Sequence, residues 1–210
     1  MAVLTPELRA EAERIVARYP GGRERSAIMP LLYLVQSIEG RVTRDGMREV
    51  AEILGTTTAE VEAVATFYTM LRTAATGTHV VTVCTNLSCT LRGARDVYDR
   101  GRRALGLRDG DTTGDGMFTL HEEECLGACD AAPVVTVNFA NFDRVTPDGI
   151  EELLSTLRDG GTPVPARGAF PGDFRAASRI LAGVATGEED PGGSTGERER
   201  ADGSPPGGGP

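Results

Sequence analysis

The sequence predicts an α+β protein with a small helical bundle, then an α/β domain, then a disordered C-terminal tail. Three observations predict this fold class. Residues 1–75 carry apolar side chains at helical spacing, and residues 76–160 alternate β-branched runs with helical stretches. Residues 161–210 begin as a Gly/Pro-rich linker and end as an acidic tail. We therefore expect three parts with these boundaries.

Four short helices are expected within residues 1–75, because each apolar stripe begins at a residue that can cap a helix. The capping residues are Thr5, Ser26, Thr43 and Thr57. Glu60 completes a capping box at the start of the fourth helix. Short loops between such helices indicate a small bundle. The stripe through Val64, Phe67 and Tyr68 is interpreted as bundle core rather than as a docking patch.

The order of elements within residues 76–160 is β-α-β-β-α, with an additional short strand expected before the last helix. The expected strands cover residues 79–84, 117–122, 133–138 and 142–145. One helix is expected to open at Cys89 and another at Thr146. A parallel β-α-β unit followed by a hairpin and a closing helix is typical of a thioredoxin-like sandwich.

The last part of the chain combines a linker with a tail that is not expected to fold. Residues 160–172 are rich in Gly and Pro, and residues 187–210 contain eight Gly and four Pro with almost no apolar side chain. Burial of so little apolar surface cannot offset the entropy lost on ordering, so this tail is expected to be disordered. Between the two, one short amphipathic helix is expected from apolar residues at Phe174, Ala177, Leu181 and Val184.

Charge and apolar composition exclude several functional classes. The net charge is −9 and all 22 basic residues are arginine, so a general nucleic-acid binder is not expected. The longest strongly apolar run, residues 27–35, is far shorter than the roughly 20 residues of a membrane-spanning helix. The first residues do not have the pattern of a secretory signal, so a reducing, cytosolic compartment is expected.

Four cysteines form two close pairs within the α/β domain. Cys84 and Cys89 make a C-x4-C motif, and Cys125 and Cys129 make a C-x3-C motif. All four are expected at the ends of strands or helices, where side chains from separate loops converge. Four thiolates suit a structural zinc ion or a [2Fe–2S] cluster, and the spacing alone leaves both open. A reducing compartment disfavours two disulfides, and neither pair has the C-x-x-C spacing of a thiol oxidoreductase.

Three stretches of the chain carry a resemblance to a known family. VCTNLSCTLRGA starts at Val83, and TTGDGMFTLHEEECLGACDAAPVVTVN covers residues 112–138. These two stretches resemble the two halves of the thioredoxin-like [2Fe–2S] ferredoxin family. LGTTTAEVEAVATFYTML, residues 54–71, resembles the N-terminal region of those members that are the small [2Fe–2S] subunit of respiratory NADH:quinone oxidoreductase. The resemblance covers about residues 10–160.

This resemblance implies a function as well as a fold. It implies that Cys84, Cys89, Cys125 and Cys129 ligate one [2Fe–2S] cluster. It also implies electron transfer in the NADH-oxidising arm of the complex, by exchange of single electrons with the FMN of a partner subunit that carries a [4Fe–4S] cluster and the NADH site. The bundle is expected to help dock the chain on that subunit, on the cytoplasmic side of the membrane and without lipid contact. No G-x-G-x-x-G motif follows a strand, so no NADH site and no complete active site are expected in this chain.

Two alternative functions remain open at this point. Similar subunits serve NAD-linked formate dehydrogenases and NAD-reducing hydrogenases, which would keep the cluster and change the complex. The second alternative belongs to another class, a non-redox interaction module built around a structural zinc ion. Metal content separates the second alternative from the redox functions.

Small residues near the cysteines are expected to bring the backbone close to the cluster. The N–H groups of Gly127, Ala128 and Ala131 can approach the sulfurs because no bulky side chain intervenes. The helix after Cys89 is expected to point its first N–H groups at the cluster. Pro133 lies in the same loop, and a trans peptide bond is expected before it.

Charged residues near the cysteines are expected to act on the reduction potential. Arg92 and Arg95 lie in the helix after the first pair and would raise it, whereas the glutamates at residues 122–124 would lower it. His79 and His121 are the only histidines, and we interpret both as packed or exposed side chains rather than as ligands.

Overall fold

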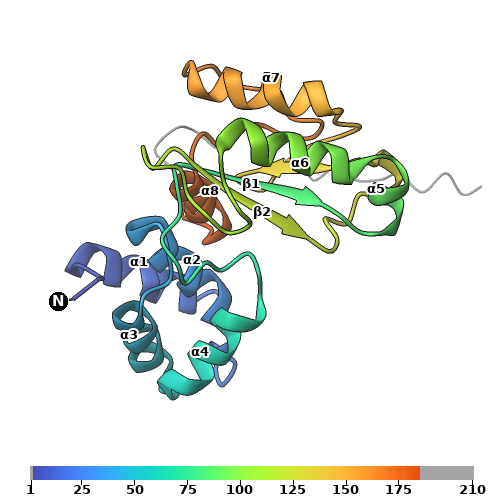
Figure 1. Cartoon of the computed structure of the whole chain (residues 1–210). Helices are drawn as coiled ribbons and strands as arrows, with labels where there is room; N and C mark the ends of the chain where they lie inside the picture. The colour runs from blue at the N-terminus through green and yellow to red at the C-terminus, as the bar shows by residue number, and fades with distance from the viewer. Residues whose placement is uncertain (1, 185–210) are drawn as a thin grey trace, which may run out of the picture.

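A computed structural model of the chain describes residues 2–184, with the helices of the N-terminal part on one side of a sheet domain (Figure 1). The expected disordered tail at residues 187–210 lies outside the described residues. The described part is a mixture of helices and a four-stranded sheet, as the sequence predicts for an α+β fold.

Four α-helices form the N-terminal bundle. They are α1 (Pro6–Val16), α2 (Ile28–Glu39), α3 (Arg44–Leu54) and α4 (Thr58–Phe67). Side-chain caps begin three of them, because Thr5, Thr43 and Thr57 each accept a backbone N–H from the first turn. Thr57 and Glu60 form the expected capping box. Both α2 and α3 end at a glycine in the left-handed conformation, at Gly40 and Gly55.

The expected cap at Ser26 is wrong. A short 3₁₀ turn, η1 (Glu24–Ala27), leads directly into α2, and Ala27 occupies the capping position without a side-chain hydrogen bond. The N–H of Ile28 bonds to the carbonyl of Arg25 in this turn. A backbone carbonyl of the 3₁₀ turn therefore accepts an N–H group at this end of α2, where a serine hydroxyl was expected to accept one.

The sheet has the order β2-β1-β3-β4, with β1 parallel to β2 and the other neighbours antiparallel. The strands are β1 (His79–Cys84), β2 (Phe118–Glu123), β3 (Val135–Val137) and β4 (Ala140–Phe142). Two helices, α6 (Ala94–Leu105) and α7 (Pro147–Arg158), lie over one face of the sheet (Figure 1). Valines of the strands pack there against aliphatic residues of α7, such as Ile150 and Leu154. This arrangement confirms the predicted thioredoxin-like order of elements.

The last strand lies earlier than expected. A strand was predicted at residues 142–145, but β4 ends at Phe142. Asn138 and Phe139 both adopt positive φ angles, 51° and 70°, and make a two-residue turn directly after β3. Such a turn matches the twist of a hairpin, so β4 starts at once.

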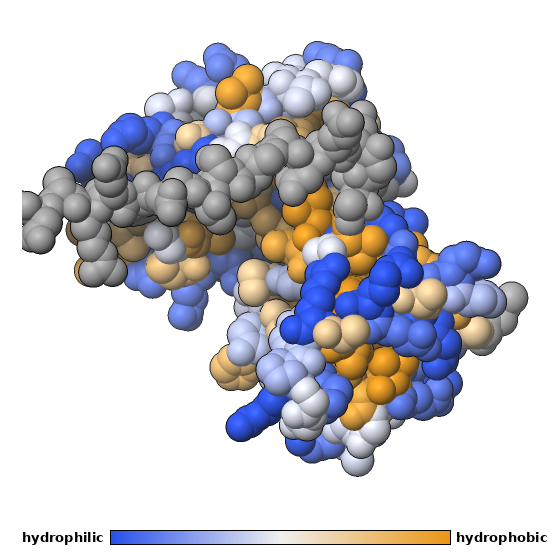
Figure 2. Space-filling model, turned by 180° about the vertical axis from the view of Figure 1, so that it is seen from behind, coloured by the Kyte–Doolittle hydropathy of each residue, from blue (hydrophilic) through white to orange (hydrophobic). Residues whose placement is uncertain are grey.

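The predicted helix in the C-terminal part is present as α8 (Phe174–Leu181), and it packs against α2 (Figure 1). Phe174 is almost fully buried, with 1% of its surface exposed. The amide of Gln36 on α2 donates to Oγ of Ser178 at 3.1 Å. The chain therefore crosses the sheet domain and returns to the bundle. Seen from behind, apolar side chains gather where the two lobes meet (Figure 2).

Within residues 2–184, no helix is both long enough and apolar enough to cross a membrane.

Candidate metal centre

Cys84 ends β1 and lies in a pocket of small residues. Its N–H donates to the carbonyl of Val134 at 3.0 Å, and its Cα is paired with that of Glu123 in the parallel register. The Cys84 side chain is buried in a separate cluster of apolar residues at this end of the sheet. The other members of this cluster are Cys89, Ala94, Ala128, Ala131, Ala132 and Val134. Most of these are alanine, whose small side chains leave room for the two thiols.

Cys89 lies inside a helix rather than at its start, so the predicted helix beginning at this residue is wrong. The helix α5 (Leu87–Leu91) starts after Asn86, whose side chain accepts the N–H of Leu87. Gly93 then adopts a φ of 91° and separates α5 from α6. The left-handed glycine breaks what the apolar spacing suggested was one helix. The first N–H groups of α5 consequently precede Cys89 instead of following it.

Cys125 and Cys129 lie in the loop between β2 and β3. Cys125 follows β2 after one residue, and Cys129 opens a short 3₁₀ turn, η2 (Cys129–Ala131). The N–H of Gly127 donates to Sγ of Cys125 at 3.4 Å, and Gly127 has a φ of 73°. Both of these cysteines are exposed, whereas Cys84 and Cys89 are buried. The site therefore has an inner pair of thiols and an outer pair.

The four thiols interact with one another. The pKa of Cys89 is raised to about 11, first by burial and then by a hydrogen bond with Cys84. The pKa of Cys129 is raised chiefly by the charge of Cys125 and a hydrogen bond with it. The charge of Cys84 also raises the pKa of Cys129, and that of Cys129 raises the pKa of Cys89. All four predicted site residues therefore meet at one end of the sheet.

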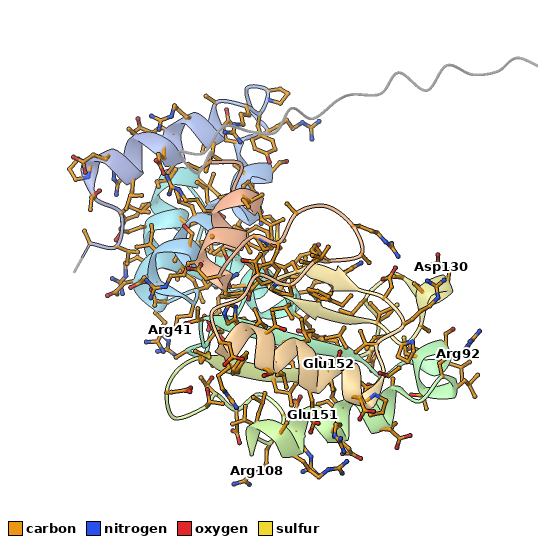
Figure 3. The ribbon with its side chains drawn as sticks, turned by 90° about the horizontal axis from the view of Figure 1, so that it is seen from above. Arg41, Arg92, Arg108, Asp130, Glu151 and Glu152 are labelled. Carbon is orange, nitrogen blue, oxygen red and sulfur yellow. The ribbon has the colours of Figure 1, made fainter. Side chains whose placement is uncertain are left out.

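Two residues that flank the cysteines are labelled in Figure 3. Arg92 follows α5, and Asp130 is next to Cys129; both lie at the same end of the molecule (Figure 3). Arg92 projects away from the fold. Figure 3 also shows Arg108 near the far end of α6, away from this site.

The donor set fits a [2Fe–2S] cluster. All four cysteines are free thiols. The thiols are arranged as two contacting pairs, and a [2Fe–2S] cluster takes two cysteines on each iron.

The two predicted arginines near the site have different surroundings. Arg92 has no ion pair within residues 2–184, whereas Nη1 of Arg95 lies 2.9 Å from Oε2 of Glu122 in an exposed pair. A third arginine lies near the site without any sequence pattern that indicates it. Nη2 of Arg72 lies 3.3 Å from Oε1 of Glu123, and this pair is mostly buried. The two residues are 51 positions apart, so no local pattern indicates their contact.

The histidines lie on β1 and β2 without reaching the cysteines. His79 is at the opposite end of β1 from Cys84, and its Nδ1 is 3.1 Å from Nδ2 of Asn138. His121 is on β2, and burial, followed by the charge of Arg72, lowers its pKa to about 4. Both are partly buried side chains.

The peptide bond before Pro133 is cis, so the expected trans bond is wrong. It lies between η2 and β3, and the carbonyl of Pro133 accepts the N–H of Val145 at 3.0 Å.

The interpretation of Phe67 and Tyr68 as bundle core is also wrong. Phe67 is 76% exposed and Tyr68 is 41% exposed, although Val64 packs against the bundle core as predicted. The helix ends at Phe67, and Tyr68 is already extended, so the helical stripe does not continue. The two rings line a groove of about 540 Å³ that Cys125 and Leu126 also line. An exposed apolar surface therefore borders the outer thiols.

Comparison with known proteins identifies the family of this chain. The model of the thioredoxin-like [2Fe–2S] ferredoxin family matches residues 12–158. The chain is 47% identical over 177 residues to the E subunit of NADH-quinone oxidoreductase from Mycobacterium tuberculosis, an alignment that covers 84% of this chain and 69% of that protein. It is 42% identical over 149 residues to subunit 2 of NADH-quinone oxidoreductase from Thermus thermophilus, an alignment that covers 70% of this chain and 82% of that protein.

A solved structure shares the fold at lower identity. An NAD⁺-reducing [NiFe]-hydrogenase in its H2-reduced state superimposes with a TM-score of 0.51 and 18% identity, over 55% of this chain and 20% of that one. With the family match and the relatives above, the chain belongs to the thioredoxin-like [2Fe–2S] ferredoxin family, among relatives that are subunits of NADH-quinone oxidoreductase.

Proposed function

We propose that Cys84, Cys89, Cys125 and Cys129 hold one [2Fe–2S] cluster and that the chain is an electron-transfer subunit. The observation that carries this proposal is the meeting of two sequence-distant thiol pairs at one end of the sheet, one pair buried and one exposed. When bound, such a cluster takes up and releases one electron at a time.

The buried and the exposed cysteines have different surroundings and different proposed roles at the site. The buried pair, Cys84 and Cys89, lies among alanines that exclude water from the inner side. The N–H of Gly127 is placed to donate to the sulfur of Cys125, which stabilises negative charge on the thiolate. The exposed pair leaves the outer side open to a partner. Electron exchange is therefore expected at the outer pair.

The proposed partner is the subunit that binds NADH and FMN in the NADH-oxidising arm of NADH:quinone oxidoreductase. Names of the relatives support a role in that multi-subunit complex. FMN and NADH would be held by the partner, so this chain alone would have no complete active site for the translocase. The helical bundle would help to dock it, on the cytoplasmic side of the membrane and with no direct contact with lipid.

The alternatives make different predictions for the purified complex. An NAD-linked formate dehydrogenase or NAD-reducing hydrogenase would yield its own catalytic subunit beside this chain. A structural-zinc module would contain one zinc per chain and no iron. Identification of the co-purifying subunits and of the metal therefore decides among the three.

The first experiment measures iron and acid-labile sulfide in the anaerobically purified chain. Two irons and two sulfides per chain are expected for a [2Fe–2S] cluster, with a visible absorption band that dithionite bleaches. C125S is expected to lose or alter that band, because one iron loses a thiolate. H79N and H121N are matched controls that should leave it unchanged. An unaltered spectrum in C125S, or zinc in place of iron, would contradict the proposal.

A further inference from the structure

Arg72 joins the two parts of the chain, because its backbone is held by the bundle and its side chain reaches the sheet. Its N–H donates to Oε1 of Gln36 on α2 at 2.7 Å, and its carbonyl accepts the N–H of Val42 at 2.7 Å. Gln36 is fully buried, and its amide also donates to the carbonyl of Met70 and to Ser178 of α8. The position of the Arg72 backbone is therefore set by α2 and α8.

The guanidinium of Arg72 forms a buried ion pair at the end of β2. Its Nη2 is 3.3 Å from Oε1 of Glu123, and only 15% and 19% of the two side chains are exposed. The Nε of Arg72 is buried without a hydrogen-bond partner among residues 2–184. Burial lowers the pKa of Arg72, yet an arginine remains charged at neutral pH. The cation therefore lies where water screens it weakly.

The preceding residue of β2 carries a comparable pair that is open to solvent. Arg95 and Glu122 are 2.9 Å apart, with 59% and 38% of their side chains exposed. Successive residues of a strand point to opposite faces, so the two glutamates place one pair on each face of the sheet. Loss of either arginine removes the same charge beside the same strand, but only Arg72 acts in a weakly screened environment.

The buried pair lies beside cysteines of both motifs. Glu123 is opposite Cys84 in the parallel register, and neighbouring strands are about 4.8 Å apart. Glu123 also precedes Cys125 by two residues, and Arg72, Glu123 and Cys125 line the same groove. Asp109 is the other acid whose charge acts on Arg72. The field of Arg72 therefore extends over the place where the four thiols meet.

Charge near the four thiols changes the relative stability of the oxidised and the reduced cluster. Four thiolates make a [2Fe–2S] cluster negative, and reduction adds another electron. A fixed cation stabilises the reduced form more than the oxidised form, whereas an unpaired buried carboxylate does the opposite. The balance between Arg72 and Glu123 therefore bears on the midpoint potential.

We propose that Arg72 is a positioning residue of the cluster site, which offsets Glu123 and raises the midpoint reduction potential. This inference rests on the proposed function, because it requires a cluster at the four cysteines. Since α2 and α8 hold the backbone of Arg72, the potential depends on how the bundle is seated on the sheet. A partner that shifts the bundle would thereby change the potential without touching a cysteine.

The test is a redox titration of the full chain at pH 8, in which the EPR signal of the reduced cluster is measured at each potential. R72M is expected to lower the midpoint potential and E123Q to raise it. The double variant R72M/E123Q is expected to return close to the unsubstituted chain. R95M and E122Q are the matched controls on the exposed face and should shift the potential less than R72M and E123Q. Potential shifts of opposite sign in R72M and E123Q that cancel in the double variant would show that the charges act on the potential. A merely structural role of Arg72 would not produce this cancellation.

Iron and sulfide content, measured on each chain, keeps this proposal separate from the proposed function. Absence of a cluster from the unsubstituted chain contradicts the function. A loaded cluster whose potential is unchanged in R72M, or moves in the same direction in R72M and E123Q, overturns the role of Arg72.

Two further variants cover the case in which R72M does not load a cluster. R72Q keeps a donor for Glu123 but no charge, and it should lower the potential, whereas R72K should stay close to the unsubstituted chain. If neither R72Q nor R72K loads a cluster, the midpoint potentials of E123Q and E122Q test the proposal. A potential shift in E123Q that is no larger than the shift in E122Q overturns it.

Discussion

At the scale of single residues, the surroundings of a side chain decide its chemistry more than its identity does. The four cysteines are alike in sequence, but two are buried among alanines and two are exposed. Glu122 and Glu123 are adjacent on β2, yet one forms an exposed ion pair and the other a buried one. Because burial controls how strongly water screens a charge, neighbours in sequence can have unequal effects on a redox centre.

His121 provides a pH-dependent test at this scale. Its pKa is lowered from 6.5 to about 4, first by burial and second by the charge of Arg72. The unfolded chain binds a proton at His121 below about pH 6.5, while the folded chain does so only below about pH 4. Stability is therefore lost as the pH falls from the first of these values to the second. The loss within this window is at most about 1.4 kcal/mol for each pH unit.

The measurement is urea unfolding of the unsubstituted chain and of H121Q at pH 7 and pH 5. The unsubstituted chain should lose more stability between the two pH values than H121Q, because the variant lacks this titration. H79Q is the comparison variant: burial also lowers the pKa of His79, but the charge of Asp173 opposes this effect, so H79Q should reduce the pH dependence less than H121Q does. An equal pH dependence for the unsubstituted chain and H121Q would show that His121 is not held neutral by its surroundings.

At the scale of elements, α8 shows how a segment distant in sequence completes a core. It packs against α2, and Ser178 satisfies the buried amide of Gln36. Gln36 also bonds to the backbone of Met70 and Arg72 in the loop after α4. One buried side chain thus links three segments, because a buried polar group must find partners wherever the fold places them. The periodicity of α8 predicts a helix, but not the helix against which it packs.

Phe174 tests whether α8 is part of the folded core. F174A should destabilise the chain by about 3–5 kcal/mol, because it leaves a cavity beneath a residue that is 1% exposed. I180A removes an apolar side chain from the same helix at a position that is 54% exposed, and it should cost less than about 0.5 kcal/mol. Urea unfolding with a common m-value checks both. Similar losses in the two variants would mean that α8 is held by something other than its buried face.

At the scale of the whole molecule, one end of the sheet domain and the end of α4 together form the surface next to the outer thiols. Phe67, Tyr68 and Met70 are exposed there, in the groove that Leu126 also lines. The helix α5, which carries Cys89, also exposes Leu87 and Leu91. Exposed apolar residues thus occur near cysteines of both motifs, and under the proposed function this surface meets the partner subunit.

Phe67 tests this surface. F67D should leave the fold and the iron content unchanged, since the ring is 76% exposed, while it weakens association with the other subunits of the complex. V164D is the control, because Val164 is 89% exposed and lies in the segment between α7 and α8. The share of the complex that a tagged chain retains during purification gives the result. Equal retention by F67D and V164D would place the interface elsewhere.

Local pattern in the sequence is sufficient to predict several parts of this protein. Capping residues and apolar spacing predict the helices, β-branched runs predict the strands, and the two cysteine motifs predict the candidate site. These features follow from residues close together in the chain, where helix and strand periodicity operates. Local pattern misplaced the start of the helix at Cys89 and the exposure of Phe67, because a left-handed glycine and a helix end changed the direction of the chain.

Contacts between residues distant in sequence become known only from the packed fold. Arg72 contacts Glu123, and α8 packs against α2, although these segments lie far apart in sequence. Packing also decides which two cysteines are buried and which two are exposed. Burial and screening are properties of the packed whole, so the charges that act on the candidate site emerge only when the bundle is seated on the sheet.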